Sequence, residues 1–178
     1  MSEERFKNEL KQILRLKTLL DGDTVLPLRF EITPESLNLR RFRLTLSGVT
    51  SLAGSSHRTA NKFILLVEVP AGYPRTAIPN IRFVDPIPFH PHVYESGKIC
   101  WGTVSSPQVD LFLVDWLRGV IEYLQYDQDQ GSLLRIDPTS PANSTAMEWW
   151  LANSRRISSF VRPIDLSRLR FWINRSRG

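Results

Sequence analysis

The chain has 178 residues, of which 42% are hydrophobic and 23% are charged, a composition typical of a globular protein with one core. No apolar run approaches the ~20 residues of a membrane span, and the first residues, Met-Ser-Glu-Glu, do not form a secretory signal. The single cysteine excludes an internal disulfide and fits a reducing compartment, so we expect a cytoplasmic protein. The net charge of +5 comes from residues 144–178, because the preceding residues carry sixteen basic and sixteen acidic groups.

Residues 3–20 are predicted to form an amphipathic helix, which Asp-Gly-Asp at 21–23 ends. Its apolar positions recur at spacings near 3.6, at Phe6, Leu10, Ile13, Leu14 and Leu20. Away from them, Lys7, Lys11 and Arg15 follow at four-residue steps and make a basic stripe. The stripe is either a solvated face or a contact surface.

Four strand-like runs are expected next, at 25–32, 40–47, 62–69 and 81–84. The second run alternates in hydrophobicity at Phe42, Leu44 and Leu46, as a strand with one buried face does. Glycine and serine at 47–56 predict a turn between the second and third runs.

Residues 85–107 show no period, and Pro86, Pro88 and Pro91 exclude a helix there. Irregular segments of this length inside a compact domain are usually functional. This one carries Cys100, whose use is packing, metal binding or thiol chemistry. Metal binding is the weakest alternative, because a zinc site needs about four ligands and only His90, His92 and Glu95 lie nearby.

Two helices are predicted after the irregular segment. The first opens at Val114 and runs to Tyr126, with Asp115 as a possible N-cap. The second begins at Ser140 as N-cap, with Pro141 in its first position, and runs to about Arg156. The order of helix, four strands, irregular segment and two helices predicts an α+β fold with an antiparallel meander.

Three motifs resemble those of the ubiquitin-conjugating enzymes. Val-Pro-Ala-Gly-Tyr-Pro at 69–74 looks like the family's strand end and Tyr-Pro turn. His-Pro-His-Val at 90–93 with Gly-Lys-Ile-Cys at 97–100 is similar to the family's His-Pro-Asn-Ile and Gly-x-Ile-Cys, with the same spacing of eight from the asparagine position to the cysteine. Asp-Pro-Thr-Ser-Pro-Ala-Asn at 137–143 resembles a third family motif with two residues missing. The likeness covers about residues 3–155.

The sequence also departs from the family pattern. His92 replaces the asparagine, Trp101-Gly102 replaces Leu-Asp, and Ser105-Ser106-Pro107 stands where the family has Trp-Ser-Pro. Such departures are typical of divergent members, including bacterial relatives, that act on ubiquitin-like proteins rather than on ubiquitin.

The resemblance implies that Cys100 accepts the C-terminus of a ubiquitin-like protein from an activating enzyme as a thioester, and transfers it to an amine on a target. It implies no cofactor and no metal, and it leaves open whether a ligase takes part. The alternative, from another functional class, is a noncatalytic module that binds a ubiquitin-like protein on the same fold.

The resemblance also assigns roles to other residues. His92 takes the asparagine's place as an oxyanion donor, acts as a base on the amine, or only orders the loop. Ser140 lies where the family has a residue at the gate of the cysteine, although a helix N-cap explains it equally well. Lys7, Lys11 and Arg15 match the face of the first helix that docks the activating enzyme.

We therefore expect a catalytic domain at 1–157 and a basic C-terminal extension at 158–178. In the extension, arginines are interleaved with apolar residues such as Leu169, Phe171 and Trp172. This pattern favours a segment that folds onto the domain or binds a protein partner over one that binds nucleic acid. Base stacking on Phe171 and Trp172 is the competing interpretation.

Overall fold

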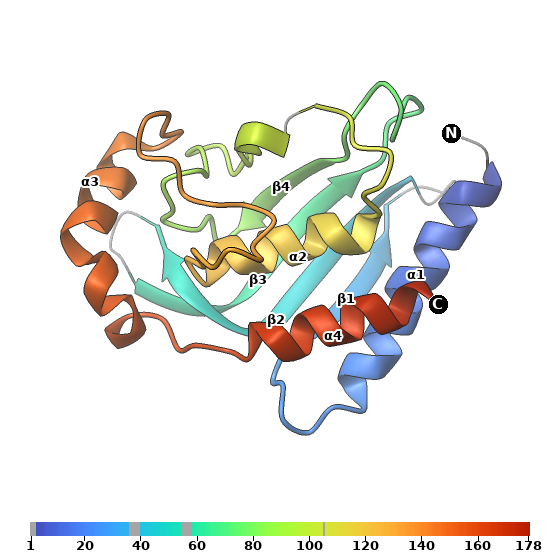
Figure 1. Cartoon of the computed structure of the whole chain (residues 1–178), viewed down its shortest axis with the longest axis horizontal. Coiled ribbons are helices and arrows are strands. Elements are labelled where there is room, and N and C mark those ends of the chain that lie inside the picture. The colour runs from blue at the N-terminus through green and yellow to red at the C-terminus, as the bar shows by residue number, and fades with distance from the viewer. Residues whose placement is uncertain (1–2, 36–39, 55–57, 105) are drawn as a thin grey trace.

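The computed structural model describes residues 3–35, 40–54, 58–104 and 106–178, and it shows helices packed around a four-stranded sheet (Figure 1). The predicted α+β class is confirmed. The elements in chain order are α1 Glu3–Asp21, β1 Arg29–Pro34, β2 Arg41–Ala53, β3 Arg58–Glu68, β4 Asn80–Asp85, α2 Leu113–Leu124, α3 Ser144–Asn153 and α4 Leu166–Arg177, with short 3-10 segments at Gly102–Val104 and Ser154–Ser159.

The sheet is an antiparallel meander in the order β1-β2-β3-β4. In β2, Phe42, Leu44 and Leu46 are buried whereas Arg41 and Arg43 are exposed, so the sheet places one face on the core. The turn predicted at 47–56 is wrong over its first part, because β2 continues to Ala53 and pairs with β3 beyond a bulge that follows Ser47. The end of that prediction, at 55–56, lies outside the described residues.

The first strand begins later than predicted, at Arg29 instead of Val25. The cause is Asp23, whose Oδ1 accepts hydrogen bonds from the amides of Val25 and Leu26 at 2.8 and 3.0 Å. An aspartate that bonds to the backbone two and three residues on stabilises a turn and competes with strand pairing.

The apolar side of α1 packs on the core, and its buried apolar residues are Phe6, Ile13, Leu16 and Leu20. Leu14, predicted to be part of this side, is instead 53% exposed. The buried carboxylate of Glu9 accepts hydrogen bonds from the Tyr73 hydroxyl and from the Leu113 amide, both at 3.0 Å. Glu9 therefore fixes α1 to the start of α2, and burial raises its pKa.

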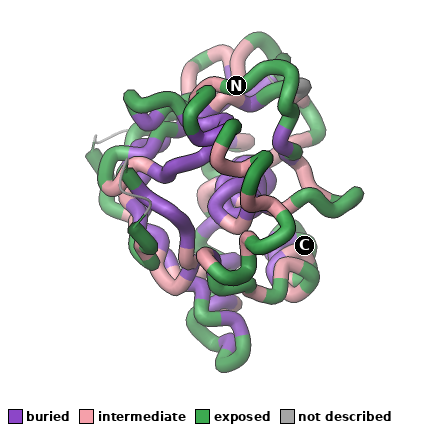
Figure 2. The backbone as a smooth tube through the Cα atoms, turned by 90° about the vertical axis from the view of Figure 1, so that its left-hand side faces the viewer, coloured by how far each residue is buried: buried purple, intermediate pink, exposed green. Residues whose placement is uncertain are grey.

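The central helix is α2, in which every residue except Arg118 is buried. Figure 2 shows the buried stretches of backbone inside the molecule and exposed segments around them. The prediction of Asp115 as N-cap is wrong, because Phe112 holds that position. Asp115 lies at the third helical position, where its carboxylate accepts a hydrogen bond from the backbone N–H of Phe112. The predicted helix at this place is confirmed with shifted ends.

The next helix, α3, begins at Ser144 and not at the predicted Ser140. Its N-cap is Asn143, whose side chain accepts a hydrogen bond from the Ala146 amide at 3.0 Å. The amides of Ala142 and Asn143 both donate to the carbonyl of Pro91, at 2.8 and 3.0 Å. These bonds hold the residues before Ser144 outside the helix.

The C-terminal helix α4 lies beside α1 (Figure 1). Its Leu169 and Ile173 are fully buried and belong to the same apolar cluster as the sheet, α1 and α2. The apolar side of the extension is thus used within the chain. Of the two alternatives for the extension, folding onto the domain holds for these two residues, and binding to a protein partner stays a prediction.

Three arginines of α4 contact carboxylates of other elements. Arg168 pairs with Asp23, Arg170 with Glu122 and Asp127, and Arg177 with Asp115.

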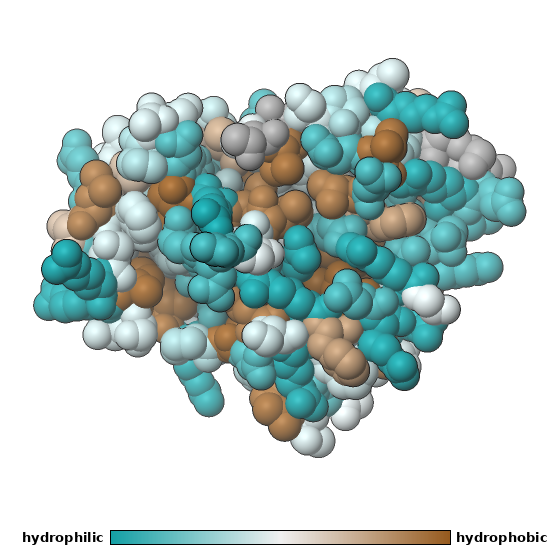
Figure 3. All heavy atoms as spheres, viewed as in Figure 1, coloured by the Kyte–Doolittle hydropathy of each residue, from teal (hydrophilic) through white to brown (hydrophobic). Residues whose placement is uncertain are grey.

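On the face shown in Figure 3, hydrophilic groups cover most of the surface and hydrophobic groups show between them. Within the described part of the chain, no helix is both long and apolar enough to cross a membrane.

Candidate active site

Cys100 lies on an irregular segment between β4 and α2, as predicted, and residues 86–102 are here called the cysteine loop. The loop folds back on itself, since the Cys100 amide donates to the His92 carbonyl at 2.8 Å. It is also tied to the sheet, because the Phe83 amide donates to the Gly97 carbonyl at 2.8 Å. Gly97 has a φ of +80°, and a Cβ there would stand 2.0 Å from the Phe83 carbonyl oxygen, so this contact requires glycine.

The Cys100 side chain is half-buried and opens on a cleft of about 770 Å³. One wall is the cysteine loop with Tyr94 and Lys98. The opposite wall comes from residues 127–143, here called the facing loop, which contributes Ser132, Leu133, Leu134, Arg135, Asp137 and Ser140. The floor includes Tyr123 of α2, whose hydroxyl donates to the Cys100 carbonyl at 2.9 Å.

His90 lies in the interior behind the cleft with no exposed surface. Its Nδ1 accepts the backbone N–H of His92 at 3.0 Å, and its ring packs on the rings of Tyr123 and Tyr126. Burial holds the pKa of His90 well below its usual range, so the ring is neutral at physiological pH. These contacts agree with a structural role.

His92 joins the two loops. Its ring is only 1% exposed, and Nε2 accepts the backbone N–H of Asp137 at 2.8 Å. Burial lowers the pKa of His92, against the opposing effect of the Asp137 carboxylate. The ring is therefore neutral at physiological pH, and the proton sits on Nδ1, which is buried and has no hydrogen-bond partner among the residues that the structure describes.

This geometry separates the alternatives for His92. Neither ring nitrogen belongs to the lining of the cleft, and Nε2 is already used by Asp137. The contacts favour the loop-ordering interpretation over an oxyanion donor or a base. The catalytic role given to His92 stays a prediction.

Ser140 lines the same cleft as Cys100 and is exposed. The alternative interpretation of Ser140 as a helix N-cap is wrong, since α3 begins four residues later. Its predicted place at the gate of the cysteine is compatible with the cleft and is taken up below.

The basic stripe of α1 lies on the surface, where Lys7, Lys11 and Arg15 are all exposed. Lys7 and Lys11 line a shallow hollow of about 560 Å³ together with Arg5 and Phe112. None of the three stripe residues lines the cleft of Cys100, so the structure gives two separate surfaces.

Several residues of the cleft were not singled out by the sequence. Asp137 belongs to a motif but carries no predicted role, and Tyr123 lies within the predicted helix at 114–126 without a predicted role. Leu133 and Arg135 lie in a stretch without a recognisable pattern. Among the described residues, which exclude His57, no three histidine, cysteine or carboxylate side chains gather where they could hold a metal ion.

Comparison with known proteins gives one consistent result. The family model for the ubiquitin-conjugating enzymes matches residues 23–163. A protein of Dictyostelium discoideum named "Probable ubiquitin-conjugating enzyme E2 W" is 32% identical over 135 residues, which cover 70% of this chain and 85% of that protein. "Ubiquitin-conjugating enzyme 15" of Arabidopsis thaliana is 37% identical over 65 residues, or 35% of this chain and 36% of the relative.

A solved structure is similar in fold. It is a Plasmodium yoelii protein described as a ubiquitin conjugating enzyme, with a TM-score of 0.50 and 18% identity, and the match covers 93% of this chain and 94% of that one. At this identity the likeness concerns the fold alone.

Proposed function

The chain belongs to the ubiquitin-conjugating enzyme family, and from this premise we propose that Cys100 carries a ubiquitin-like protein as a thioester and passes it to an amine of a target protein. The observation that carries the proposal is the position of the chain's only cysteine, half-buried in an open cleft between two loops. A thiol that opens on a cleft needs a reducing environment to persist, which supports a cytosolic reaction.

The reaction has two steps. In loading, the Cys100 thiolate attacks the thioester carbonyl presented by an activating enzyme, a C–S bond forms at Cys100, and the donor cysteine leaves as a thiolate. In transfer, an amine nitrogen attacks the Cys100 thioester, a C–N bond forms, and the C–S bond breaks to return the thiolate. The amine proton passes to solvent. The attacking species in loading is the thiolate.

His92 supports this reaction by position. Because its Nε2 receives the Asp137 amide, it fixes the facing loop relative to the cysteine loop. Ser140 stands at the rim of the cleft, where its hydroxyl is available to the arriving amine or to the tail of the ubiquitin-like protein. The exposed Lys7, Lys11 and Arg15 of α1 dock the activating enzyme.

A loading assay tests the proposal. The chain is incubated with an activating enzyme, ATP and ubiquitin or a ubiquitin-like protein, and adducts are separated with and without thiol reductant. We expect an adduct that disappears on reduction and that Cys100→Ala does not form. An adduct that persists in Cys100→Ala contradicts the proposal.

The second candidate is a noncatalytic module that binds a ubiquitin-like protein on this fold. The observation that favours it is His92, a buried histidine where the family has asparagine, with no ring nitrogen at the cleft. If every ubiquitin-like protein tested binds reversibly and none loads onto Cys100, this second function replaces the first.

A further inference from the structure

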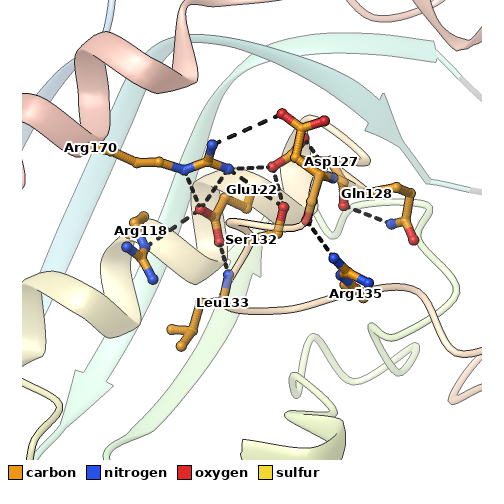
Figure 4. Close-up of polar contacts among 9 residues, drawn as sticks. Arg118, Glu122, Asp127, Gln128, Ser132, Leu133, Arg135 and Arg170 are labelled. Carbon is orange, nitrogen blue, oxygen red and sulfur yellow. Dashed lines mark hydrogen bonds and ion pairs between the residues drawn. The ribbon is translucent and has the colours of Figure 1, made fainter.

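A network of charges connects the C-terminal helix to the wall of the Cys100 cleft (Figure 4). Its centre is Arg170 of α4. The guanidinium donates from Nη2 to Asp127 Oδ2 at 2.7 Å and from Nε to Glu122 Oε1 at 3.3 Å. Asp127 opens the facing loop and Glu122 belongs to α2, so one side chain joins three parts of the fold.

The partners of Arg170 hold the wall itself. Glu122 has no exposed surface, and its second oxygen accepts the backbone N–H of Leu133 at 2.7 Å. Asp127 Oδ2 also accepts the Ser132 hydroxyl. Ser132 and Leu133 both line the cleft of Cys100, so each carboxylate held by Arg170 fixes one residue of that wall.

The wall rests closely on α2. A Cβ on Gly119 would stand 2.9 Å from Leu134 and 3.2 Å from Leu133, so the facing loop packs directly over this glycine. Gly131 of the same loop is covered by the guanidinium, since a Cβ there would stand 3.5 Å from Arg170 Nη1. The loop is thus held between α2 on one side and Arg170 on the other.

The buried carboxylate of Glu122 depends on the cations that pair with it. Glu122 has Arg118 and Arg170 as cations, and burial raises its pKa against their effect. Loss of one partner of a buried, hydrogen-bonded pair is costly, because the remaining charge stays desolvated. The carboxylate then moves or takes up a proton, and either change alters its bond to the Leu133 amide.

We infer that Arg170 is a positioning residue, which holds Ser132 and Leu133 against α2 and so sets the width of the cleft in front of Cys100. The consequence of this role of Arg170 for transfer rests on the proposed function, whereas its effect on the width of the cleft does not. A residue of the extension, which lines no part of the cleft, would thereby control access to the thiol.

The lone cysteine makes a direct test possible, because alkylation of the protein reports on Cys100 alone. Two variants weaken the network. Arg170→Ala removes its centre, and Asp127→Ala removes the closer of the two loop carboxylates while leaving Arg170 paired with Glu122 and, at 3.9 Å, with Asp129. Arg175→Ala is the matched control, an exposed arginine on the same helix.

The first readout is hydrogen exchange at the Leu133 amide. Because hydrogen bonds to charged groups are among the stronger ones, weakening this bond in Arg170→Ala should speed local exchange about tenfold or more. The second readout is the rate of alkylation of Cys100 by a bulky maleimide relative to iodoacetamide. Both variants should raise this ratio about threefold or more as the wall moves away from α2. Arg175→Ala should change neither readout.

The outcomes are distinct. Unchanged exchange at Leu133 and an unchanged alkylation ratio in both variants overturn the inference. If all protected amides speed up together and the melting temperature falls equally in both variants, Arg170 only stabilises the fold, which also overturns it. Failure of thioester loading in the unmodified chain removes the proposed function, yet the alkylation result still decides the role of Arg170.

Discussion

Along α1, Lys11 and Arg15 are exposed, whereas along α4, Arg168 and Arg170 contact carboxylates of the same chain. In the sequence both helices interleave basic and apolar residues, and each buries its apolar side in one common core. The difference lies in the acidic groups that the fold brings to α4, namely Asp23, Asp115, Glu122 and Asp127. A basic helix therefore becomes structural or available to a partner according to residues far away in the chain.

The ion pairs of α4 also shift the pKa of a group that they join. The Arg168 guanidinium holds the pKa of Asp23 well below its usual range, and Asp23 in turn accepts the indole N–H of Trp172. The same carboxylate shapes the turn before β1 through its other oxygen. One acidic residue thus links the start of the sheet to the end of the chain.

The largest expected effect comes from the apolar side of α4. Leu169→Ala should reduce the free energy of unfolding by about 2–5 kcal/mol, because a fully buried leucine leaves a cavity when truncated. Phe171, on the same helix, is 54% exposed, so Phe171→Ala is the matched control. It should reduce the free energy of unfolding by under about 1 kcal/mol. Chemical denaturation measures both. Similar losses in the two variants would mean that α4 is not part of the core.

A smaller effect is expected from the basic stripe of α1. Reversing the charge of Lys7, Lys11 and Arg15 should slow loading about tenfold at low salt, since three exposed charge pairs contribute ~0.2–1 kcal/mol each. The penalty should shrink towards 0.5 M salt because exposed pairs are screened beyond roughly 8–10 Å. Lys62→Glu, on the exposed surface of β3, provides the control and should load normally. If the charge-reversed variant loads at the normal rate at low salt, the stripe is a solvated face and does not contact the activating enzyme.

The smallest effect concerns titration of buried histidines. The pKa values of His90 and His92 are lowered by burial, so below pH ~6.5 the unfolded chain binds more protons than the native one. This contribution to stability is present above pH ~6.5 and is lost as the pH falls. The buried carboxylates Glu9 and Glu122, with raised pKa values, act in the opposite direction at lower pH.

A matched variant isolates the histidine contribution. His92→Gln places an amide oxygen near the position of Nε2 as an acceptor for the Asp137 amide but does not titrate. Between pH 7 and pH 5 its melting temperature should fall less than that of the unmodified chain. Parallel curves would show that His92 is protonated equally in the native and unfolded states.

The sequence predicted what depends on local periodicity. The spacing of Phe6, Ile13 and Leu20 gave α1, and the alternation at Phe42, Leu44 and Leu46 gave β2 with the correct buried face. The lack of any period at 85–107 correctly located the loop of Cys100. Each of these signals lies within one segment, where the residues that face the core repeat at the period of the element.

The errors come from contacts between segments. The predicted cap at Ser140 followed a sound local rule, but the Pro91 carbonyl binds the amides of Ala142 and Asn143 and delays the helix. The role of His92, inferred from its position in a motif, also depends on a distant contact, because Asp137 occupies its Nε2, and the catalytic role stays a prediction. For α4, the sequence left open whether the extension folds onto the domain or binds a partner, because the Asp127 and Asp23 carboxylates that pair with its arginines are 43 and 145 residues away.

The most direct test of the account is the chemical nature of the adduct at residue 100, measured by intact mass before and after treatment with thiol. We compare the unmodified chain with Cys100→Ser, in which a loaded group would form an oxygen ester. The account predicts a mass increase in both, removed by thiol only from the unmodified chain, and removed by mild alkali from Cys100→Ser. An adduct on the unmodified chain that resists thiol, or a mass increase that Cys100→Ala also shows, would contradict it.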